Sequence, residues 1–551
     1  MFPRSLFAPS KSTATIYFFI TIFLICISDF VFFLKTEQYS MAILGGLACL
    51  SLQLLPVFLF KNRIKLYLLL LTPVFILLPF NLGSILLFGV PANEATILLL
   101  INTNFNEASE LMEGYWLRLA ASIFFYVVGL LILLTKAPNI ISKKSASLTS
   151  AISLIVLFLV PLIENGIKDY FVTLRSRYYT VFPTSLLYSA KMIRSQYQLV
   201  HSTKKERENF KFNATQDSII NGKQVYVLVI GESSRYDHWG INGYERNTSP
   251  NLSKRENLIS FNQVAAGGFI TEYAIPLLLT GVGAGNFDKH YQQKSIVSAF
   301  KEAGFSTYWL TNQIDEGHIS LHIEEAENPH RLVSDFRATK NVHRDMELVH
   351  ILNKVLKEPE EKKFIVLHLS GSHYDYSARY PDEFDVFKPS NKTVFSKSAD
   401  KKFKNVLVNS YDNTIVYSDA VIDSVISMVS NQNALSSVSY ISDHGENLFD
   451  DNRDLSQHAY PVPSKYISHI PFFVWYSPIL EKTFPQKIAN LKLHKNKKIS
   501  SENIIHTLTS LSGIVYSKQD SSKNITSLYY KNSEQLILGA NRKVYRSSNL
   551  E

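Results

Sequence analysis

The sequence predicts a membrane-embedded helical half followed by a globular α/β half. The long apolar runs of the 551-residue chain lie mostly before residue 165. From Gln224 on, short apolar runs alternate with longer amphipathic stretches, as in a domain with a largely parallel sheet. Side chains able to bind metals follow the ends of three of these short runs. We therefore expect a five-helix transmembrane bundle over residues 1–164, an interfacial connector over residues 165–220 and a globular domain over residues 221–551.

The membrane half is predicted from apolar segments that are each close to the length of about 20 residues needed to cross a bilayer. The first is longer than the core of a signal peptide and is followed by further spans, so we expect it to be retained. The predicted spans are Thr15–Leu34, Met41–Phe60, Leu66–Val90, Leu117–Thr135 and Leu148–Ile163.

The orientation of the bundle follows from its loops, because positively charged loops stay in the cytoplasm. Basic residues precede the first span and lie between the second and third spans and between the fourth and fifth, whereas the other loops are poor in them. An odd number of spans then puts everything after residue 164 outside the cytoplasm. The basic residues in question are Arg4, Lys11, Lys61, Arg63, Lys65, Lys136, Lys143 and Lys144.

The loop Pro91–Trp116 lies outside the cytoplasm in this topology and contains glutamates but no basic residue. Its apolar residues recur at nearly helical spacing, so it forms either an amphipathic helix at the interface or a solvated loop. The glutamates are Glu94, Glu107, Glu110 and Glu113.

The composition excludes several classes of protein. The net charge of +9 comes from scattered Lys and Arg rather than from basic stripes, so we expect anionic membrane or glycolipid partners and no nucleic acid. The only cysteines, Cys26 and Cys49, lie within apolar runs. The globular half therefore has no disulfide, no thiolate metal ligand and no cysteine nucleophile.

Three predicted strands of the globular half end in polar side chains. Val225–Ile230 is followed by Glu232, Phe364–Leu367 leads towards His373, and Val438–Ile441 is followed by Asp443 and His444. Because ligands bind at the carboxyl ends of strands in open α/β sheets, we expect these side chains to converge. Carboxylates and imidazoles without cysteine suit zinc, or manganese if the site is richer in oxygen.

Three motifs resemble those of the bacterial phosphoethanolamine transferases, which belong to the alkaline phosphatase and sulfatase superfamily. They are Gly231–Arg235, Gly243–Pro250 and Ser442–Glu446. The resemblance covers the whole chain and implies a sulfatase-like fold for the globular domain. It also implies a multi-pass protein of the bacterial inner membrane with its catalytic domain in the periplasm.

The resemblance assigns roles to individual residues. It implies a primary metal site formed by Glu232, Thr271, Asp443 and His444, in which Thr271 of the stretch Thr271–Pro276 is the nucleophile. Further residues have implied roles outside this primary site. Those for a second metal or substrate are His373 and His458, those for the headgroup are Thr103 and Glu107, and a further candidate near the substrate is His318.

The implied reaction transfers phosphoethanolamine from phosphatidylethanolamine to lipopolysaccharide or another envelope glycan. It proceeds through a phospho-threonine and releases diacylglycerol. The stretch Trp309–Gln313 resembles the branch that acts on core sugars. The acceptor itself stays open among lipid A phosphate, Kdo, core heptose and glucan.

Two departures from the family pattern concern the headgroup pocket and the disulfides. Leu99 stands where an asparagine is expected, and the disulfides of the lipid A branch are absent. Two alternatives stay open: a phosphoglycerol transferase acting on a glucan or teichoic-acid-like acceptor, and a non-catalytic membrane scaffold. A formylglycine sulfatase is disfavoured because Thr271 lacks the required Cys/Ser-x-Pro-x-Arg setting.

Overall fold

The computed structural model describes most of the chain, and its described residues form two compact units. Unit 1 contains the described residues up to Tyr197, and unit 2 contains those from Gln198 on. The described residues are 11–35, 39–88, 91–92, 97, 116–165, 181–217, 220–313, 319–332, 343–394, 401–458, 462–539 and 542–550.

Unit 1 is helical. Among its described residues, three helical stretches are long and apolar enough to cross a membrane: Ser12–Phe32, Ile43–Phe60 and Lys143–Ile163. Helices of the described residues in this unit are α1 (Lys11–Lys35), α2 (Tyr39–Leu54), α3 (Val57–Phe60), α4 (Ile64–Leu70), α5 (Thr72–Phe88), α8 (Trp116–Lys136) and α9 (Lys143–Asn165).

The structure differs from the predicted five-helix bundle in two of its helices. The predicted third span is broken into α4 and α5, which bend by 46° and count as one span only if they are taken together. Pro73, in the first turn of α5, has no backbone N–H and accounts for the break. In the predicted fourth span, the apolar stretch Ala120–Lys136 is shorter than the other candidates. In the described part of unit 1, three helices therefore have the length and apolarity of a membrane span, or four if the bent pair is one span.

A further helix, α11 (Thr184–Asn209), lies within the predicted connector. It is polar over most of its length, in contrast to α1 and α9. Near its end Arg207 forms an ion pair with Glu325, and the Arg207 guanidinium also donates to the His290 carbonyl. The end of α11 is therefore fixed to unit 2.

Unit 2 is built on a seven-stranded sheet of order β3-β11-β8-β2-β7-β5-β6. Strands β8, β2, β7, β5 and β6 are parallel, and β11 is antiparallel to both neighbours. This confirms the predicted α/β class with a largely parallel sheet. The strands are β2 (Gln224–Gly231), β3 (Leu258–Ser260), β5 (Ser306–Thr311), β6 (Asn328–Arg331), β7 (Lys362–His368), β8 (Leu435–Ser442) and β11 (Phe472–Tyr476).

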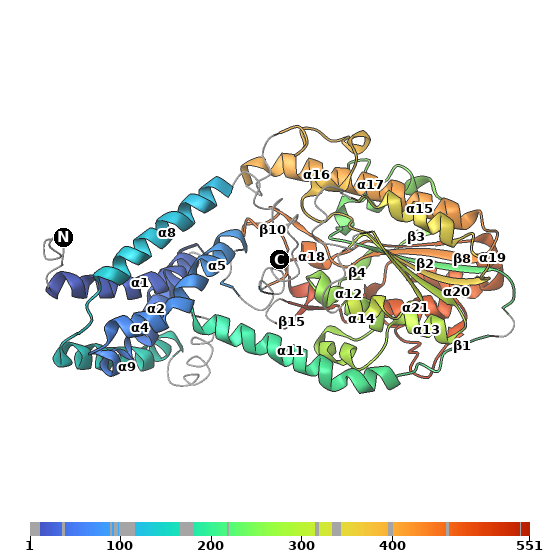
Figure 1. Ribbon diagram of the computed structural model, residues 1–551. Helices are drawn as coiled ribbons and strands as arrows, with labels where there is room; N and C mark the ends of the chain where they lie inside the picture. The colour runs from blue at the N-terminus through green and yellow to red at the C-terminus, as the bar shows by residue number, and fades with distance from the viewer. Residues whose placement is uncertain are drawn as a thin grey trace. The chain divides into compact units, whose positions relative to one another are not determined.

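Helices cover both faces of this sheet (Figure 1). On one face, α15 (Met346–Val355) and α17 (Lys404–Ser430) bury apolar side chains against alternate residues of the central strands. On the other face lie α12 (Thr271–Thr280), α13 (Ile296–Glu302) and α21 (Asn503–Leu511). Because β2 is buried along its whole length, its continuous apolar run is that of a strand covered on both sides.

Shorter elements complete unit 2. Its short α-helices are α14 (Ser320–Ile323), α16 (Tyr376–Arg379), α18 (Lys465–Ser468), α19 (Pro478–Thr483) and α20 (Pro485–His494). Its short strands are β1 (Thr215–Gln216), β4 (Gln263–Ala265), β9 (Asn447–Leu448), β10 (Ser456–Gln457), β12 (Lys498–Ser500), β13 (Ile514–Val515), β14 (Leu536–Leu538) and β15 (Val544–Arg546). Its 3-10 helices are Tyr236–His238, Gly240–Asn242, Leu252–Lys254, Ala284–Tyr291, Asp382–Phe384, Lys401–Phe403 and Ser547–Asn549.

Candidate metal centre

The centre begins at the carboxyl end of β2, where the register aligns three strand ends. Ile230 lies opposite His368 of β7, and Gly231 lies opposite Ser442 of β8. The residues that follow these strands therefore meet at one edge of the sheet, as the sequence predicted.

Glu232 follows β2 and is fully buried. The next residue, Ser233, has a φ of 55°, which a residue with a side chain adopts only where the surroundings enforce it. The Ser233 hydroxyl donates to Glu232 Oε1 at 2.8 Å, and its backbone N–H donates to Asp443 Oδ1 at 3.1 Å. This turn therefore fixes the carboxylates of both residues.

Asp443 and His444 follow β8 and are also buried. The His444 Nδ1–H donates to the Gly445 carbonyl at 2.8 Å, so the lone pair of the neutral ring is on Nε2. That nitrogen lies 3.5 Å from Glu232 Oε1 and 3.4 Å from Asp443 Oδ2. A Cβ on Gly445 would lie 2.1 Å from the Tyr466 carbonyl oxygen, so only glycine fits beside the ligand loop.

Among the described residues, Glu232, Asp443 and His444 form the group whose ligand atoms all lie within 4.8 Å of one another. Asp443 Oδ2 is buried and has no hydrogen-bond partner. Burial raises the pKa of Asp443 to about 7, and burial together with the Asp443 charge raises the pKa of Glu232. Two buried carboxylates, one with an unpartnered oxygen, beside an imidazole lone pair fit a divalent cation.

Thr271 is the first residue of α12 and is half-buried. Its Oγ1 donates to Glu232 Oε2 at 3.1 Å and lies 3.3 Å from His444 Nε2. The helix starts directly after the extended Ile270, so the Thr271 hydroxyl lies at the positive end of the helix dipole. A helix start of this kind favours an anionic group bonded to Thr271.

His373 and His458 lie beside this group. The His458 ring centroid is 4.4 Å from that of His444 and 6.1 Å from that of His373. Burial lowers the pKa of His373 to about 4 and that of His458 to about 3, so both rings are neutral at pH 7. The His458 Nδ1 lies 3.3 Å from Glu446 Oε1. Neutral imidazoles here can bind a second ion or carry a proton.

The remaining predicted residues cannot be placed in the centre. Thr103, Glu107 and His318 lie outside the described residues.

One contact to the metal ligands was not predicted. The Gln313 side-chain amide donates to Glu232 Oε2 at 3.1 Å and to the Leu369 carbonyl at 3.0 Å. Gln313 comes shortly after β5, the neighbour of β7. The rule that placed Glu232 at a strand end therefore applies to Gln313 as well.

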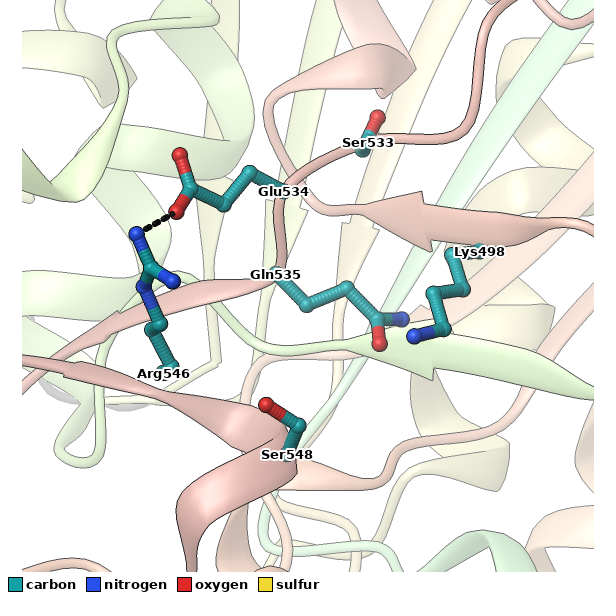
Figure 2. Close-up of a pocket in the computed structure, with 6 residues that line it drawn as sticks. All are labelled: Lys498, Ser533, Glu534, Gln535, Arg546 and Ser548. Atoms are coloured by element: carbon teal, nitrogen blue, oxygen red, sulfur yellow. Dashed lines mark ion pairs between the residues drawn. The ribbon is translucent and has the colours of Figure 1, made fainter.

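A separate hollow lies near the C-terminus of unit 2 (Figure 2). Its side chains are polar, and Arg546 pairs there with Glu534 at 2.8 Å. The hollow shares no residue with the metal centre. The residues that line it are Lys498, Ser533, Glu534, Gln535, Arg546 and Ser548.

Comparison with known proteins places the chain in a family. Residues 224–514, more than half of the chain, match the sulfatase family. Phosphoethanolamine transferase EptC of Escherichia coli O18:K1:H7 is 27% identical over an alignment of 512 residues, which covers 88% of this chain and 87% of that relative.

The chain is also similar to solved structures, among them a periplasmic domain and an integral membrane protein. The C-terminal periplasmic domain of EptC from Escherichia coli, in complex with zinc, matches with a TM-score of 0.54 and 26% identity. That match covers 61% of this chain and 96% of the domain. The integral membrane lipooligosaccharide phosphoethanolamine transferase A (EptA) of Neisseria meningitidis matches with a TM-score of 0.77 and 21% identity, over 94% of this chain and 98% of that one. At this identity the likeness to EptA concerns the fold. The chain belongs to the sulfatase family, and its predicted membership of the metal-dependent phosphoethanolamine transferases is confirmed.

Proposed function

We propose that the protein transfers phosphoethanolamine from phosphatidylethanolamine to a lipopolysaccharide acceptor, lipid A or a core sugar, through a phosphorylated Thr271. The observation that carries this proposal is the position of Thr271 Oγ1, 3.1 Å from Glu232 Oε2 and 3.3 Å from His444 Nε2. Relatives that carry the name phosphoethanolamine transferase support the chemical class.

Zinc is the metal that we assign to this site, with Glu232, Asp443, His444 and Thr271 as ligands. One nitrogen and several oxygen donors without thiolate suit zinc, and the similar EptC domain was crystallised with it. Manganese is the alternative, and metal analysis of the purified protein distinguishes the two. When bound, such a cation lowers the pKa of a hydroxyl beside it and offsets the charge of phosphoryl oxygens.

The exposure of the nearby hydroxyls supports Thr271 as the nucleophile. Ser233, Ser234 and Ser442 lie beside the ligands but are fully buried. Their hydroxyls bond to Glu232 Oε1, to the Trp239 indole N–H and to the His444 carbonyl, respectively. Thr271 is half-buried, so its hydroxyl is the one that a lipid headgroup can reach.

Two displacements at phosphorus complete the reaction. In the first, Thr271 Oγ1 gives up its proton and bonds to phosphorus, and the bond from phosphorus to the glycerol oxygen breaks. That oxygen takes up a proton and leaves as diacylglycerol. In the second, an acceptor oxygen gives up its proton and bonds to phosphorus, the bond from phosphorus to Thr271 Oγ1 breaks, and Oγ1 takes up a proton. His373 and His458 are the neighbouring neutral bases that can carry these protons.

The membrane half serves this reaction by keeping the catalytic domain beside its lipid donor. We assign five spans within residues 1–164, a connector over residues 165–220 and a periplasmic catalytic domain over residues 221–551. The charge asymmetry of the loops supports this multi-pass orientation in the inner membrane. Thr103 and Glu107 are the proposed headgroup contacts, because a carboxylate suits the ethanolammonium group, and His318 is a further substrate contact.

A trapped intermediate tests the proposal. Incubation of the detergent-solubilised full chain with phosphatidylethanolamine alone should give a phosphoethanolamine-modified Thr271 peptide and an equal amount of diacylglycerol. Thr271→Ala should give neither, and Thr271→Ser should retain part of both. Thr483→Ala, on the exposed end of α19, is the matched control and should behave as the wild type. Diacylglycerol that forms only after an acceptor is added, without any adduct, would replace the two-step route by direct transfer.

A further inference from the structure

Arg379 is unusual among the arginines of unit 2, because no carboxylate oxygen lies within 4.0 Å of its guanidinium in the described part of the chain. Arg344 shares this lack of a partner. The described arginines of unit 2 that do pair with a carboxylate are Arg207, Arg235, Arg246, Arg255, Arg331, Arg453, Arg542 and Arg546.

The Arg379 guanidinium lies against the loop that holds His373. Its Nε donates to the His373 carbonyl at 3.0 Å, and its Nη2 donates to the Tyr374 carbonyl at 2.9 Å. His373 Nδ1 donates to the same Tyr374 carbonyl at 2.6 Å, so the 3.4 Å contact between Nη2 and Nδ1 joins two donors. It is therefore a contact between like groups and not a hydrogen bond.

One edge of the guanidinium stays open. Nη1 donates no hydrogen bond to any described residue, and the side chain is half-buried, so solvent reaches this edge. The positive charge also disfavours protonation of His373, whose pKa is lowered first by burial and then by Arg379. Arg379 is thus a cation beside the candidate metal centre that forms no ion pair with a carboxylate of the described residues.

The loop tether alone does not explain an arginine at this position. The two carbonyl bonds use Nε and Nη2, and other donor side chains can make such bonds. What arginine adds is a permanent charge and a planar fork that matches two oxygens of a phosphate group. The unused Nη1 belongs to that fork.

We propose that Arg379 binds a phosphate oxyanion at the edge of the metal centre, through the Nη1 edge of its guanidinium. This inference rests on the proposed function, which brings phosphate groups to this site. The oxyanion has two sources: the phosphodiester of the lipid donor, and a phosphate carried by the glycan acceptor. Arg379 thus contributes either to the first displacement or to the second.

Inorganic phosphate binding to the zinc-loaded full chain tests the site directly. We expect Arg379→Gln to raise the dissociation constant for phosphate about 10- to 100-fold, as for the loss of a charge-assisted hydrogen bond. Arg379→Lys, which keeps the charge but not the fork, should raise it less. Arg546→Gln removes an exposed guanidinium that pairs with Glu534 (Figure 2), and should leave the dissociation constant unchanged.

Two kinetic arms then identify the source of the phosphate. If Arg379 binds the donor, Arg379→Gln slows formation of the Thr271 adduct from phosphatidylethanolamine alone. If it binds the acceptor, the adduct forms in Arg379→Gln at the wild-type rate. A phosphorylated acceptor then consumes the adduct more slowly than in the wild type, whereas a dephosphorylated acceptor consumes it at the wild-type rate.

Phosphate affinity in Arg379→Gln equal to that of Arg546→Gln, at unchanged zinc content, would reduce Arg379 to a loop tether. If Arg379→Gln loses zinc, its phosphate affinity no longer tests the site. Arg379→Lys then takes its place as the test variant, because its ammonium keeps a donor for the loop carbonyls. Wild-type phosphate affinity in a zinc-loaded Arg379→Lys would then overturn the inference. Absence of an adduct in the wild type would instead overturn the proposed transfer through Thr271. The phosphate-binding measurements would still show whether Arg379 binds phosphate.

Discussion

Gly371 lies in the loop between β7 and His373, and its replacement by alanine should damage the metal centre. Its φ is 48°, in the left-handed region. A Cβ at this position would lie 2.8 Å from the Glu232 nitrogen and 2.9 Å from the Glu232 carbonyl oxygen. That same oxygen accepts a hydrogen bond from the Ser372 N–H at 2.9 Å. Alanine therefore pushes directly on the backbone of Glu232, a proposed metal ligand.

Gly371→Ala has two destabilising effects, the left-handed backbone conformation and the clash with Glu232, and a control variant separates them. The left-handed conformation costs an L-residue about 1–2 kcal/mol, wherever it occurs. Gly304 has a φ of 86° and no atom within 4 Å of a built Cβ, so Gly304→Ala carries the conformational cost without a clash. Gly371→Ala adds the clash, which is relieved only if the two backbone segments move apart. The difference between the variants is therefore the effect of moving Glu232.

Zinc content and denaturant-induced unfolding of the purified protein measure both parts. We expect each variant to lose about 1–2 kcal/mol of unfolding free energy from its backbone conformation. Gly371→Ala alone should lose zinc affinity, by roughly 10- to 100-fold, the range found when groups that orient metal ligands are removed. Equal zinc affinity in the two alanine variants would refute the argument, because Glu232 would then tolerate the displacement.

Two further predictions concern single side chains. Gln313→Leu should lower zinc affinity about 10-fold, because Glu232 Oε2 loses its amide donor. Gln313→Asn keeps an amide and should lower zinc affinity less. Equal zinc affinities in the two variants would contradict a role of the Gln313 amide in orienting Glu232. His506, whose Nδ1 accepts from the Asp520 N–H, has its pKa lowered by burial to about 4. The unfolded chain therefore takes up the proton first, and about 2 kcal/mol of stability present above pH 6.5 should be lost by pH 5. In His506→Gln, the unfolding free energy measured with urea should depend less on pH between about pH 6.5 and pH 5. An unchanged pH dependence would exclude His506 as the source of this loss of stability.

The part of the site that the sequence could predict is the part that depends on topology. Glu232, Asp443 and His444 follow strands that pair in parallel, so their meeting required only the order of the strands and the rule for carboxyl ends. The motif resemblance added Thr271, which composition could not distinguish from the serines beside the ligands. Burial distinguishes them in the structure.

Other features could not be predicted because they depend on local geometry. Apolar composition identifies the predicted third span but not the 46° bend between α4 and α5 beside Pro73. A proline in an apolar run can lie within a continuous span or start a new helix, and composition does not distinguish the two. The lack of a carboxylate beside Arg379 is a property of three-dimensional packing. A sequence lists its charges but not which of them are paired.

The metal centre is held by backbone conformations on both sides of Glu232. Ser233 has a φ of 55°, and Gly371, whose φ is 48°, packs against the Glu232 backbone. Burial and the nearby carboxylate raise the pKa of Glu232, which measures how unfavourable it is to hold these charges together. The strand ends and the Ser233 turn nonetheless keep the ligand atoms of Glu232, Asp443 and His444 within 4.8 Å of one another, so a cation bound there would offset the repulsion between the two carboxylates. The Thr271 hydroxyl lies beside the same atoms, so the fold brings the proposed nucleophile to the proposed metal ligands.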